Sequence, residues 1–123
     1  MASRKVLIVD DSPVITMSVT QILSMAGFAV ETASDGMEAL EKVKSGLKPD
    51  LIITDVNMPR MGGFDFIRNV RPILRFTPIL VMTTESELSK REEARKLGAT
   101  GWLVKPVDGK DLLSVVDRVL PSH

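Results

Sequence analysis

The sequence predicts an α/β protein with a five-stranded parallel sheet covered by helices on both faces. Short apolar runs alternate with helix-spaced segments five times along the 123 residues. Strands that are each followed by a helix run parallel and are joined by right-handed crossovers. The length fits one domain. We expect that single domain to span residues 1–123, because no repeat, low-complexity tract or linker interrupts the pattern.

Five strands are expected at the apolar runs. These runs are Val6–Val9, Phe28–Ala33, Leu51–Ile53, Ile79–Met82 and Trp102–Val104. The run Phe28–Ala33 alternates apolar and polar residues and is the weakest signal. The others are continuous and are bounded by turn residues, which is typical of strands buried on both faces.

Three helices have clear start signals. The first begins at Pro13 with Ser12 as its N-cap. The second follows Asp35, which has capping-box spacing to Glu38. The last follows Asp108 and has the clearest amphipathic pattern in the chain. Their apolar positions are Ile15, Val19, Ile22 and Ala26; Leu40, Val43 and Leu47; and Leu112, Val115, Val116, Val119 and Leu120.

The third and fourth helices give weaker signals. The third is expected from about Phe64 to Val70, because Pro72 cannot continue a helix. The fourth is expected over about Leu88–Leu97, where only the two end residues and Ala94 are apolar among many charges. We therefore expect the fourth helix to be weakly anchored and mostly exposed to solvent.

Composition excludes several kinds of chemistry. The chain has no Cys, and its one His is the terminal His123, so thiolate, Ser-His and His-metal sites are not expected. Its 16 Lys plus Arg balance 16 Asp plus Glu, which argues against direct nucleic-acid binding. No apolar run approaches the ~20 residues of a membrane span. We expect a soluble, cytoplasmic protein that works through carboxylates, hydroxyls, amides and lysine.

Polar residues follow four of the five expected strands. They are Asp10 and Asp11, Asp55 and Asn57, Thr83 and Thr84, and Lys105. Because the carboxyl ends of parallel strands share one edge of the sheet, these side chains are expected to meet there. An Asp after a strand is by itself usually a turn or cap residue. Three together are different, because two like charges ~4 Å apart repel by about 4 kcal/mol at an effective dielectric near 20.

Such a cluster needs a counter-charge. A hard divalent cation with oxygen ligands meets this need, and Mg²⁺ suits a shallow, open site. Lys105 is a second cation, suited to a phosphoryl oxygen. A carboxylate beside a metal and a lysine can act as the nucleophile of phosphoryl transfer. Asp55, on the central strand, is the best placed of the three acids.

These residues resemble the receiver domains of bacterial two-component response regulators, in particular the single-domain chemotaxis regulators of the CheY type. The resemblance spans residues 5–120. Its motifs are Val9-Asp10-Asp11-Ser12, Asp55-Val56-Asn57-Met58-Pro59, Met82-Thr83-Thr84-Glu85 and Gly101-Trp102-Leu103-Val104-Lys105-Pro106. It implies a flavodoxin-like, doubly wound (βα)5 fold with strand order 2-1-3-4-5.

The resemblance also implies a phosphorylation site with its metal. Asp55 would accept a phosphoryl group from a sensor histidine kinase. Mg²⁺, or Mn²⁺ in its place, would be held by Asp10, Asp11, Asp55 and the backbone carbonyl of Asn57. Asn57 would also tune dephosphorylation. The protein would be a phosphoacceptor that catalyses its own phosphoryl transfer and dephosphorylation, rather than an enzyme acting on a separate substrate.

Further residues are assigned by the same resemblance. Thr83 and Lys105 would bind the phosphoryl group, with Thr84 beside the path of Thr83. Trp102 stands at the position of the switch aromatic residue, where relatives commonly have Tyr or Phe. Glu85 would tune dephosphorylation, and the peptide bond between Lys105 and Pro106 would be cis.

The partners implied are a sensor histidine kinase, an output protein and a phosphatase. The output protein would bind the surface of the fourth helix, fifth strand and fifth helix, and a flagellar motor switch protein is the main candidate. We expect a monomer. The alternatives are a phosphorelay intermediate or phosphate sink, and a receiver excised from a multidomain transcription regulator. A flavin-binding module is a weaker rival, because aromatic residues make up only 4% of the chain.

Overall fold

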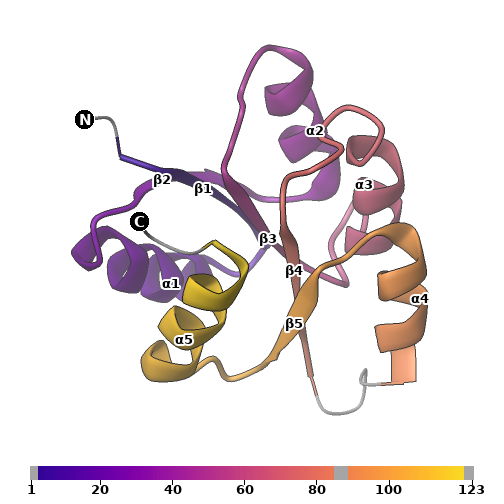
Figure 1. Cartoon of the computed structure of the whole chain (residues 1–123). Helices are drawn as coiled ribbons and strands as arrows, with labels where there is room; N and C mark the ends of the chain where they lie inside the picture. Colours follow the sequence, from indigo (N-terminus) through magenta and orange to yellow (C-terminus); the bar gives the residue numbers. More distant parts are fainter. Residues whose placement is uncertain (1–2, 85–88, 121–123) are drawn as a thin grey trace.

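A parallel sheet lies between two layers of helices (Figure 1). The structure, a computed structural model, describes residues 3–84 and 89–120. The strands are β1 (Lys5–Val9), β2 (Ala29–Ala33), β3 (Leu51–Asp55), β4 (Ile79–Thr83) and β5 (Gly101–Val104). They are ordered β2-β1-β3-β4-β5, and every neighbouring pair is parallel. The predicted fold class and strand order are confirmed.

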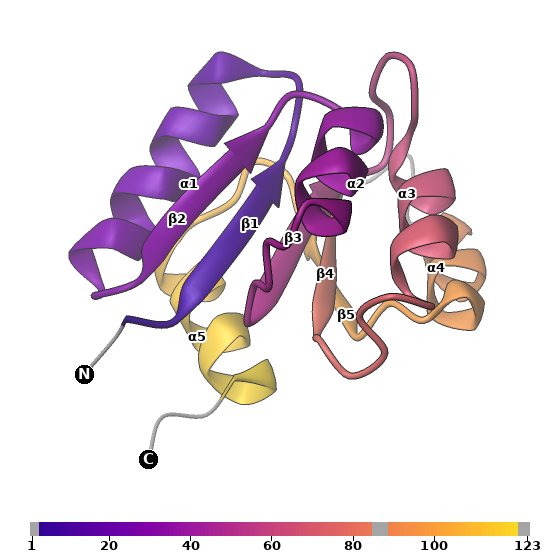
Figure 2. The same cartoon turned by 90° about the horizontal axis from the view of Figure 1, so that it is seen from above.

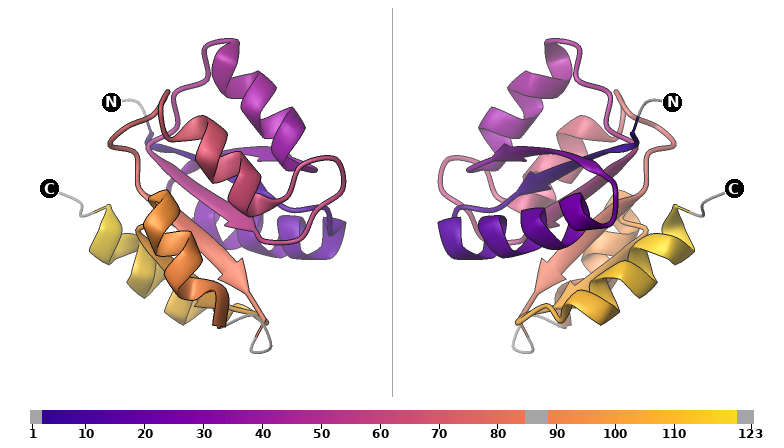
Figure 3. Two further views of the ribbon diagram at one scale, coloured as in Figure 1. Left: turned by 90° about the vertical axis from the view of Figure 1, so that its right-hand side faces the viewer. Right: turned by 90° about the vertical axis from the view of Figure 1, so that its left-hand side faces the viewer.

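The five helices divide between the two faces of this sheet (Figures 2 and 3). They are α1 (Pro13–Met25), α2 (Gly36–Lys44), α3 (Gly63–Val70), α4 (Arg91–Leu97) and α5 (Gly109–Val119). Buried residues of α1 and α5 share one apolar core, whereas those of α2, α3 and α4 share the other. Side chains along β1 point alternately to the two faces of the sheet and contribute to both cores. Val6 and Ile8 pack in the core with α1 and α5, and Leu7 and Val9 pack in the core with α2, α3 and α4.

The expected caps are present at the three helix starts with clear signals. The side chains of Ser12, Asp35 and Asp108 each accept a hydrogen bond from a backbone N–H of the first turn. Each thereby satisfies one of the donors that a helix start leaves unpaired. The Glu38 carboxylate reaches back to the backbone N–H of Ser34, at 2.8 Å, and so completes the reciprocal pattern one residue earlier than in a standard capping box.

Two helix boundaries differ from the expectation. The second helix ends at Lys44, so Leu47 lies beyond it, because Gly46 takes a φ of +117° that turns the chain out of the helix. Leu47 still packs against the core on that face of the sheet. The fourth helix begins at Arg91, and Leu88 lies outside the described residues.

The fourth helix is weakly anchored, as expected. Ala94 is the one buried residue of α4, and the charged residues around it are exposed. Such a helix has little apolar area to hold it against the sheet. Among the helices that the structure describes, none has the length and apolar character needed to cross a membrane.

Candidate functional site

Three aspartates meet at the carboxyl edge of the sheet. Asp10 directly follows β1 and Asp55 ends β3, and these strands are neighbours. One carboxylate oxygen each from Asp10, Asp11 and Asp55 lie within 4.8 Å of one another. Asp10 and Asp55 are buried, whereas Asp11 is exposed. The cluster is therefore open to solvent on the side of Asp11.

Lys105 brings a positive charge to this cluster from the loop after β5. Its Nζ lies 3.1 Å from Asp55 Oδ1 and 3.2 Å from Asp10 Oδ2. Its backbone N–H donates to the carbonyl of Thr83 at 2.7 Å, which ties the loop to the end of β4. The following peptide bond, to Pro106, is cis. One ammonium thus bridges carboxylates from two strands.

Burial and charge shift the pKa values of the central pair. Burial raises the pKa of Asp55, and the Asp10 charge adds to this, while the hydrogen bond from Lys105 opposes it. Burial works to lower the pKa of Lys105, but its contacts with Asp55 and Asp10 outweigh burial and raise that pKa above its ordinary value. Lys105 therefore stays protonated and serves as a fixed counter-charge.

The oxygen atoms of the cluster fit a hard cation. Asp10 Oδ1 accepts a hydrogen bond from the backbone N–H of Ser12 at 2.8 Å, and Asp55 Oδ1 accepts one from Val56 at 2.8 Å. Asp10 Oδ2 is buried and lies 3.2 Å from Lys105 Nζ in an ion pair, and it finds no further hydrogen-bond donor among the described residues. Three carboxylates with spare acceptor capacity are the ligand type that Mg²⁺ takes.

Thr83 carries an unsatisfied hydroxyl at the same edge. It ends β4, is buried, and finds no hydrogen-bond partner for its Oγ1 among the described residues. A buried hydroxyl without a partner is costly. Thr84 beside it is exposed, and Glu85 lies outside the described residues. The Thr83 hydroxyl is thus available to an acceptor that the chain itself does not supply.

Trp102 lies on β5, in register with Val81. Its ring is half-buried against the core shared by α2, α3 and α4. The guanidinium of Arg91, the first residue of α4, lies 4.3 Å from the ring centroid, which is a cation–π contact. This contact links α4 to β5, and nothing in the sequence pattern predicted it.

The loop after Asp55, residues 56–62, carries Asn57, which is exposed. Sequence reasoning missed what holds this loop. The guanidinium of Arg60 forms an ion pair with Asp35 at 2.9 Å, and Arg60 has a φ of +64°. An arginine gives no signal in the sequence for a left-handed backbone position.

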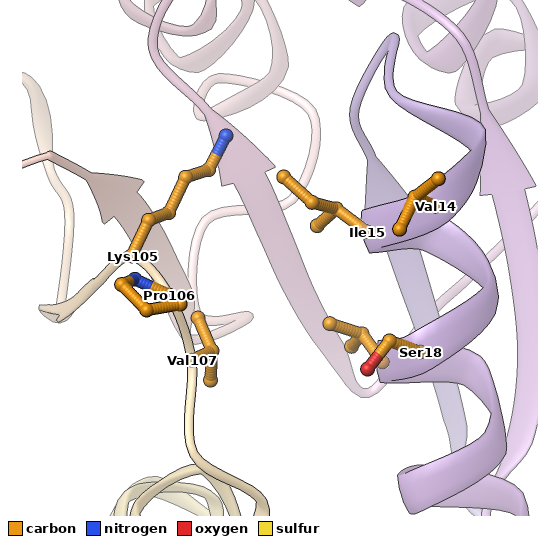
Figure 4. A pocket seen from close by; sticks show the side chains of 7 residues that line it. Val14, Ile15, Ser18, Lys105, Pro106 and Val107 are labelled. Atoms are coloured by element: carbon orange, nitrogen blue, oxygen red, sulfur yellow. The ribbon is translucent and has the colours of Figure 1, made fainter.

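An apolar hollow adjoins the polar site (Figure 4). It measures about 390 Å³ and lies between α1 and the loop after β5. It is lined by Val14, Ile15, Ser18, Val19, Lys105, Pro106 and Val107. The Lys105 stem borders this hollow, while the ammonium reaches the carboxylate cluster. Polar and apolar surfaces therefore lie side by side.

Residues 6–117 match the response regulator receiver domain family. The chain belongs to this family. Receiver domains bind Mg²⁺ in an acidic active site and interact with sensor histidine kinases and output partners. An acidic cluster is present in this receiver, formed by Asp10, Asp11 and Asp55.

Solved structures of other receivers closely resemble this one. The chemotaxis protein CheY4 of Vibrio cholerae is 50% identical, with a TM-score of 0.91 over 97% of this chain and 100% of CheY4. The receiver domain of the sensor histidine kinase PA1611 from Pseudomonas aeruginosa PAO1 is 26% identical, with a TM-score of 0.87 over 98% of this chain and 100% of its own. That receiver has a magnesium ion coordinated in its active-site cleft.

A curated relative is longer. Response regulator MprA of Mycobacterium ulcerans (strain Agy99) is 38% identical over 118 residues, which are 96% of this chain but 50% of MprA. The chain thus spans about half the length of the curated relatives that it matches. The similarity to MprA concerns the receiver part shared by the two chains.

Proposed function

We propose that this receiver is a phosphorylation-activated switch in which Asp55 accepts a phosphoryl group from the phosphohistidine of a sensor kinase. The observation that carries the proposal is the position of Asp55: its carboxylate ends the central strand β3, 3.1 Å from Lys105 Nζ and within 4.8 Å of two further carboxylates. No structural role needs three acids at one edge, because their repulsion costs stability.

The transfer is a simple displacement at phosphorus. An Asp55 oxygen forms the new P–O bond as the P–N bond to the kinase imidazole breaks, and the imidazole then carries the electron pair and picks up a proton. Asp10, Asp11, Asp55 and the backbone carbonyl of Asn57 would hold Mg²⁺, which when bound neutralises charge on the transferred group. Lys105 would pair with the phosphoryl oxygens. Asn57 and Glu85 would tune the later hydrolysis.

Phosphorylation would then be read through Thr83 and α4. The new group carries about −1.5 to −2 charges and strong acceptor oxygens, and the buried Thr83 hydroxyl has no other described partner. Movement of Thr83 toward that group would alter the surface of α4, β5 and α5. Trp102 lies on this surface, and Ala94 is the one buried residue of α4. A full shift from 1:99 to 99:1 requires about 5.5 kcal/mol, so we expect an output partner to complete it.

Asp55→Asn tests the phosphorylation site. Intact-mass analysis after incubation with acetyl phosphate and Mg²⁺ should show one added phosphate on the unmodified chain and none on Asp55→Asn. Asp65→Asn, at an exposed position on α3, is the matched control and should be labelled like the unmodified chain. Equal labelling of Asp55→Asn would contradict the assignment, and removal of Mg²⁺ should abolish labelling of every variant.

We propose chemotaxis as the pathway, with a flagellar motor switch protein as the output partner. The similarity to CheY4 over its full length supports this and a single receiver domain over residues 1–123. We place the protein in the cytoplasm, because the kinase phosphohistidine forms there. We propose that it acts as a monomer. Binding of a purified motor switch protein should strengthen when beryllofluoride, a phosphoryl mimic, is present.

A second candidate is a receiver that regulates an attached or separate output domain. The match to half of MprA supports this reading. A phosphorelay intermediate is the third, because receivers of sensor kinases are among the similar structures. If beryllofluoride fails to promote motor-protein binding but promotes self-association, the second reading replaces chemotaxis. If the chain phosphorylated on Asp55 passes its phosphoryl group to the histidine of a phosphotransfer domain, the third reading replaces it.

A further inference from the structure

An ion pair clamps the loop of residues 56–62 to the start of α2. Arg60 Nε donates to Asp35 Oδ2 at 2.9 Å, and its Nη2 donates to Asp35 Oδ1 at 3.2 Å. The backbone N–H of Gly36 donates to the carbonyl of Met61 at 2.9 Å. The loop is thereby held by a two-pronged side-chain contact and a backbone hydrogen bond at adjacent residues.

Asp35 is a fixed anchor for this clamp. Its side chain is 7% exposed, and it caps α2 by accepting a hydrogen bond from the backbone N–H of Glu38 at 2.8 Å. The Arg60 side chain, in contrast, is 59% exposed. The rigid helix start therefore holds the arginine in place, and the arginine in turn holds the loop.

The backbone at Arg60 is unfavourable for an arginine. Its φ is +64°, and the N–H of Met61 donates to the carbonyl of Pro59 at 2.7 Å, which closes a three-residue turn around Arg60. Glycine adopts a positive φ without steric cost, and turns of this kind are strained for other residues. The arginine end of the pair is exposed, which limits what the pair adds to stability, and the strained backbone at Arg60 offsets that gain. Net stability thus gives little reason for an arginine at this position.

The other end of the loop is fixed by the backbone. The N–H of Gly63 donates to the carbonyl of Val56 at 2.8 Å, and a Cβ at Gly63 would overlap the carbonyl of Asp55. Asn57 lies between this point and the Arg60 clamp. Its backbone conformation is therefore determined by two fixed points, one of which combines the Arg60 side-chain contact with the backbone hydrogen bond from Gly36 to Met61.

We propose that Arg60 is a positioning residue of the Mg²⁺ site. By gripping Asp35 it fixes loop 56–62, so that the backbone carbonyl of Asn57 is pre-organised as a metal ligand beside Asp55. The inference rests on the proposed function, because it assigns Arg60 a part in the metal site that the function requires. It predicts that metal affinity, rather than fold stability, depends on the clamp.

Arg60→Gly separates positioning from both stability and charge. Glycine relieves the unfavourable φ while removing the clamp, so the thermal unfolding midpoint should change by less than about 3 °C. Mg²⁺ affinity measured by calorimetry on the full chain should fall about tenfold, as on loss of an outer-shell partner. Loss of a positive charge alone would act in the opposite direction and tighten Mg²⁺ binding. The sign of the change therefore decides between the two.

Three further variants complete the test. Arg75→Gly removes an exposed arginine from the loop before β4 and should leave Mg²⁺ affinity within twofold. Asp35→Asn keeps an N-cap side chain but removes the charged anchor, so it should weaken Mg²⁺ binding as Arg60→Gly does. The double variant should bind Mg²⁺ no more weakly than Arg60→Gly alone, because the two substitutions remove the same contact. Backbone amides of residues 57–61 should exchange with solvent faster in Arg60→Gly.

Each outcome decides a separate question. Unchanged or tighter Mg²⁺ binding by folded Arg60→Gly would overturn the positioning role while leaving the proposed function intact. Equal weakening in Arg75→Gly would also overturn it, because the effect would then be one of general charge. Absence of Mg²⁺ binding by the unmodified chain would overturn the proposed function and this inference with it.

Discussion

Lys105 bridges two carboxylates that would otherwise repel each other. Its Nζ contacts Asp55 and Asp10 at 3.1 and 3.2 Å, and the lysine side chain is 16% exposed. Two buried carboxylates without a counter-charge are expensive, because burial disfavours the charged form and each charge disfavours the other. In the metal-free state Lys105 therefore neutralises the charge of Asp10 and Asp55, a role that a bound cation would share.

Replacing Lys105 by Met should make stability depend on metal. Met keeps most of the apolar stem but leaves Asp10 and Asp55 unpaired, so urea unfolding with EDTA should show a loss of about 2 kcal/mol in the free energy of unfolding. Mg²⁺ at saturating concentration should restore much of this loss. Lys110→Met, at an exposed position of α5, is the control. An equal loss with and without Mg²⁺ would mean that Lys105 stabilises the fold through packing of its stem.

Asp35, the N-cap of helix α2, has a carboxylate whose charged form is stabilised in the folded protein. Hydrogen bonds from Arg60 hold the pKa of Asp35 below its usual value, and the backbone N–H of Glu38 acts in the same direction, while burial opposes both. A carboxylate with a lowered pKa in the folded state stabilises the protein above its unfolded pKa, near 3.9. That contribution disappears as the pH falls through the folded value.

The acid side of the stability profile should therefore change in Asp35→Asn. The free energy of unfolding should be lower than that of the unmodified chain at pH 7. The gap should begin to narrow below about pH 4, the unfolded pKa, and should close as the pH falls through the lowered pKa of folded Asp35. Urea unfolding at pH 7, 5 and 3 measures the gap. Asp117→Asn, at an exposed position on α5, is the control. A gap that is constant with pH would show that the cap, rather than the charge, matters.

Helix α4 is held to β5 by an aromatic contact on its exposed side. The Arg91 guanidinium lies 4.3 Å from the centre of the Trp102 ring, and Ala94 is the one buried residue of the helix. A cation–π contact at an exposed site is worth about 0.5–1 kcal/mol. For a helix with so little buried area, this is a substantial part of its anchoring.

Arg91→Ala should expose Trp102 to solvent. Because Trp102 is the chain's only tryptophan, acrylamide quenching of its fluorescence reports on this residue alone. Quenching should increase in Arg91→Ala, with a loss of at most about 1 kcal/mol in stability. Arg95→Ala removes an arginine from the same helix that pairs instead with Glu92 at 2.7 Å, and its quenching should stay unchanged. Equal quenching in both variants would show that the stack does not protect the ring.

At the scale of the whole molecule, Arg71 joins two loops at the edge of the sheet opposite the acidic cluster. It follows α3 and donates hydrogen bonds to the carbonyls of Leu74, Thr77 and Gly98 at 2.8, 2.7 and 2.6 Å. The first two lie before β4 and the third lies before β5. A Cβ at Gly98 would approach Arg71 Nε to 2.9 Å, so the small residue leaves room for the guanidinium.

Arg71→Lys should destabilise the protein although the charge is kept. A single ammonium cannot reach three carbonyls in the geometry of a guanidinium, so at least one partly buried carbonyl loses its partner. Urea unfolding should show a loss of about 2 kcal/mol. Arg75→Lys, four residues later in the same loop and exposed, should have no effect. Equal unfolding midpoints for Arg71→Lys and the unmodified chain would contradict this role of the Arg71 guanidinium.

The sequence by itself determined the order of elements and the chemistry of the sheet edge. Apolar runs, caps such as Ser12 and Asp108, and the rule that parallel strands share an edge are sufficient for this, because they depend on local periodicity and on connection geometry. The same reasoning treated Asp10 and Asp11 alike, as two metal-binding acids after the first strand. In the structure Asp10 is buried and hydrogen-bonded to Ser12, while Asp11 is exposed.

The tertiary structure alone decided which distant residues touch. Arg60 meets Asp35 across 25 positions, Arg71 meets Gly98 across 27, and Arg91 stacks on Trp102. Arginine has no periodic signal, because its long side chain serves equally as a solvated surface residue or as a bridge between loops. Which of these it becomes depends on where the backbone of another element lies. That position exists only once the sheet has assembled and brought both segments to the same edge.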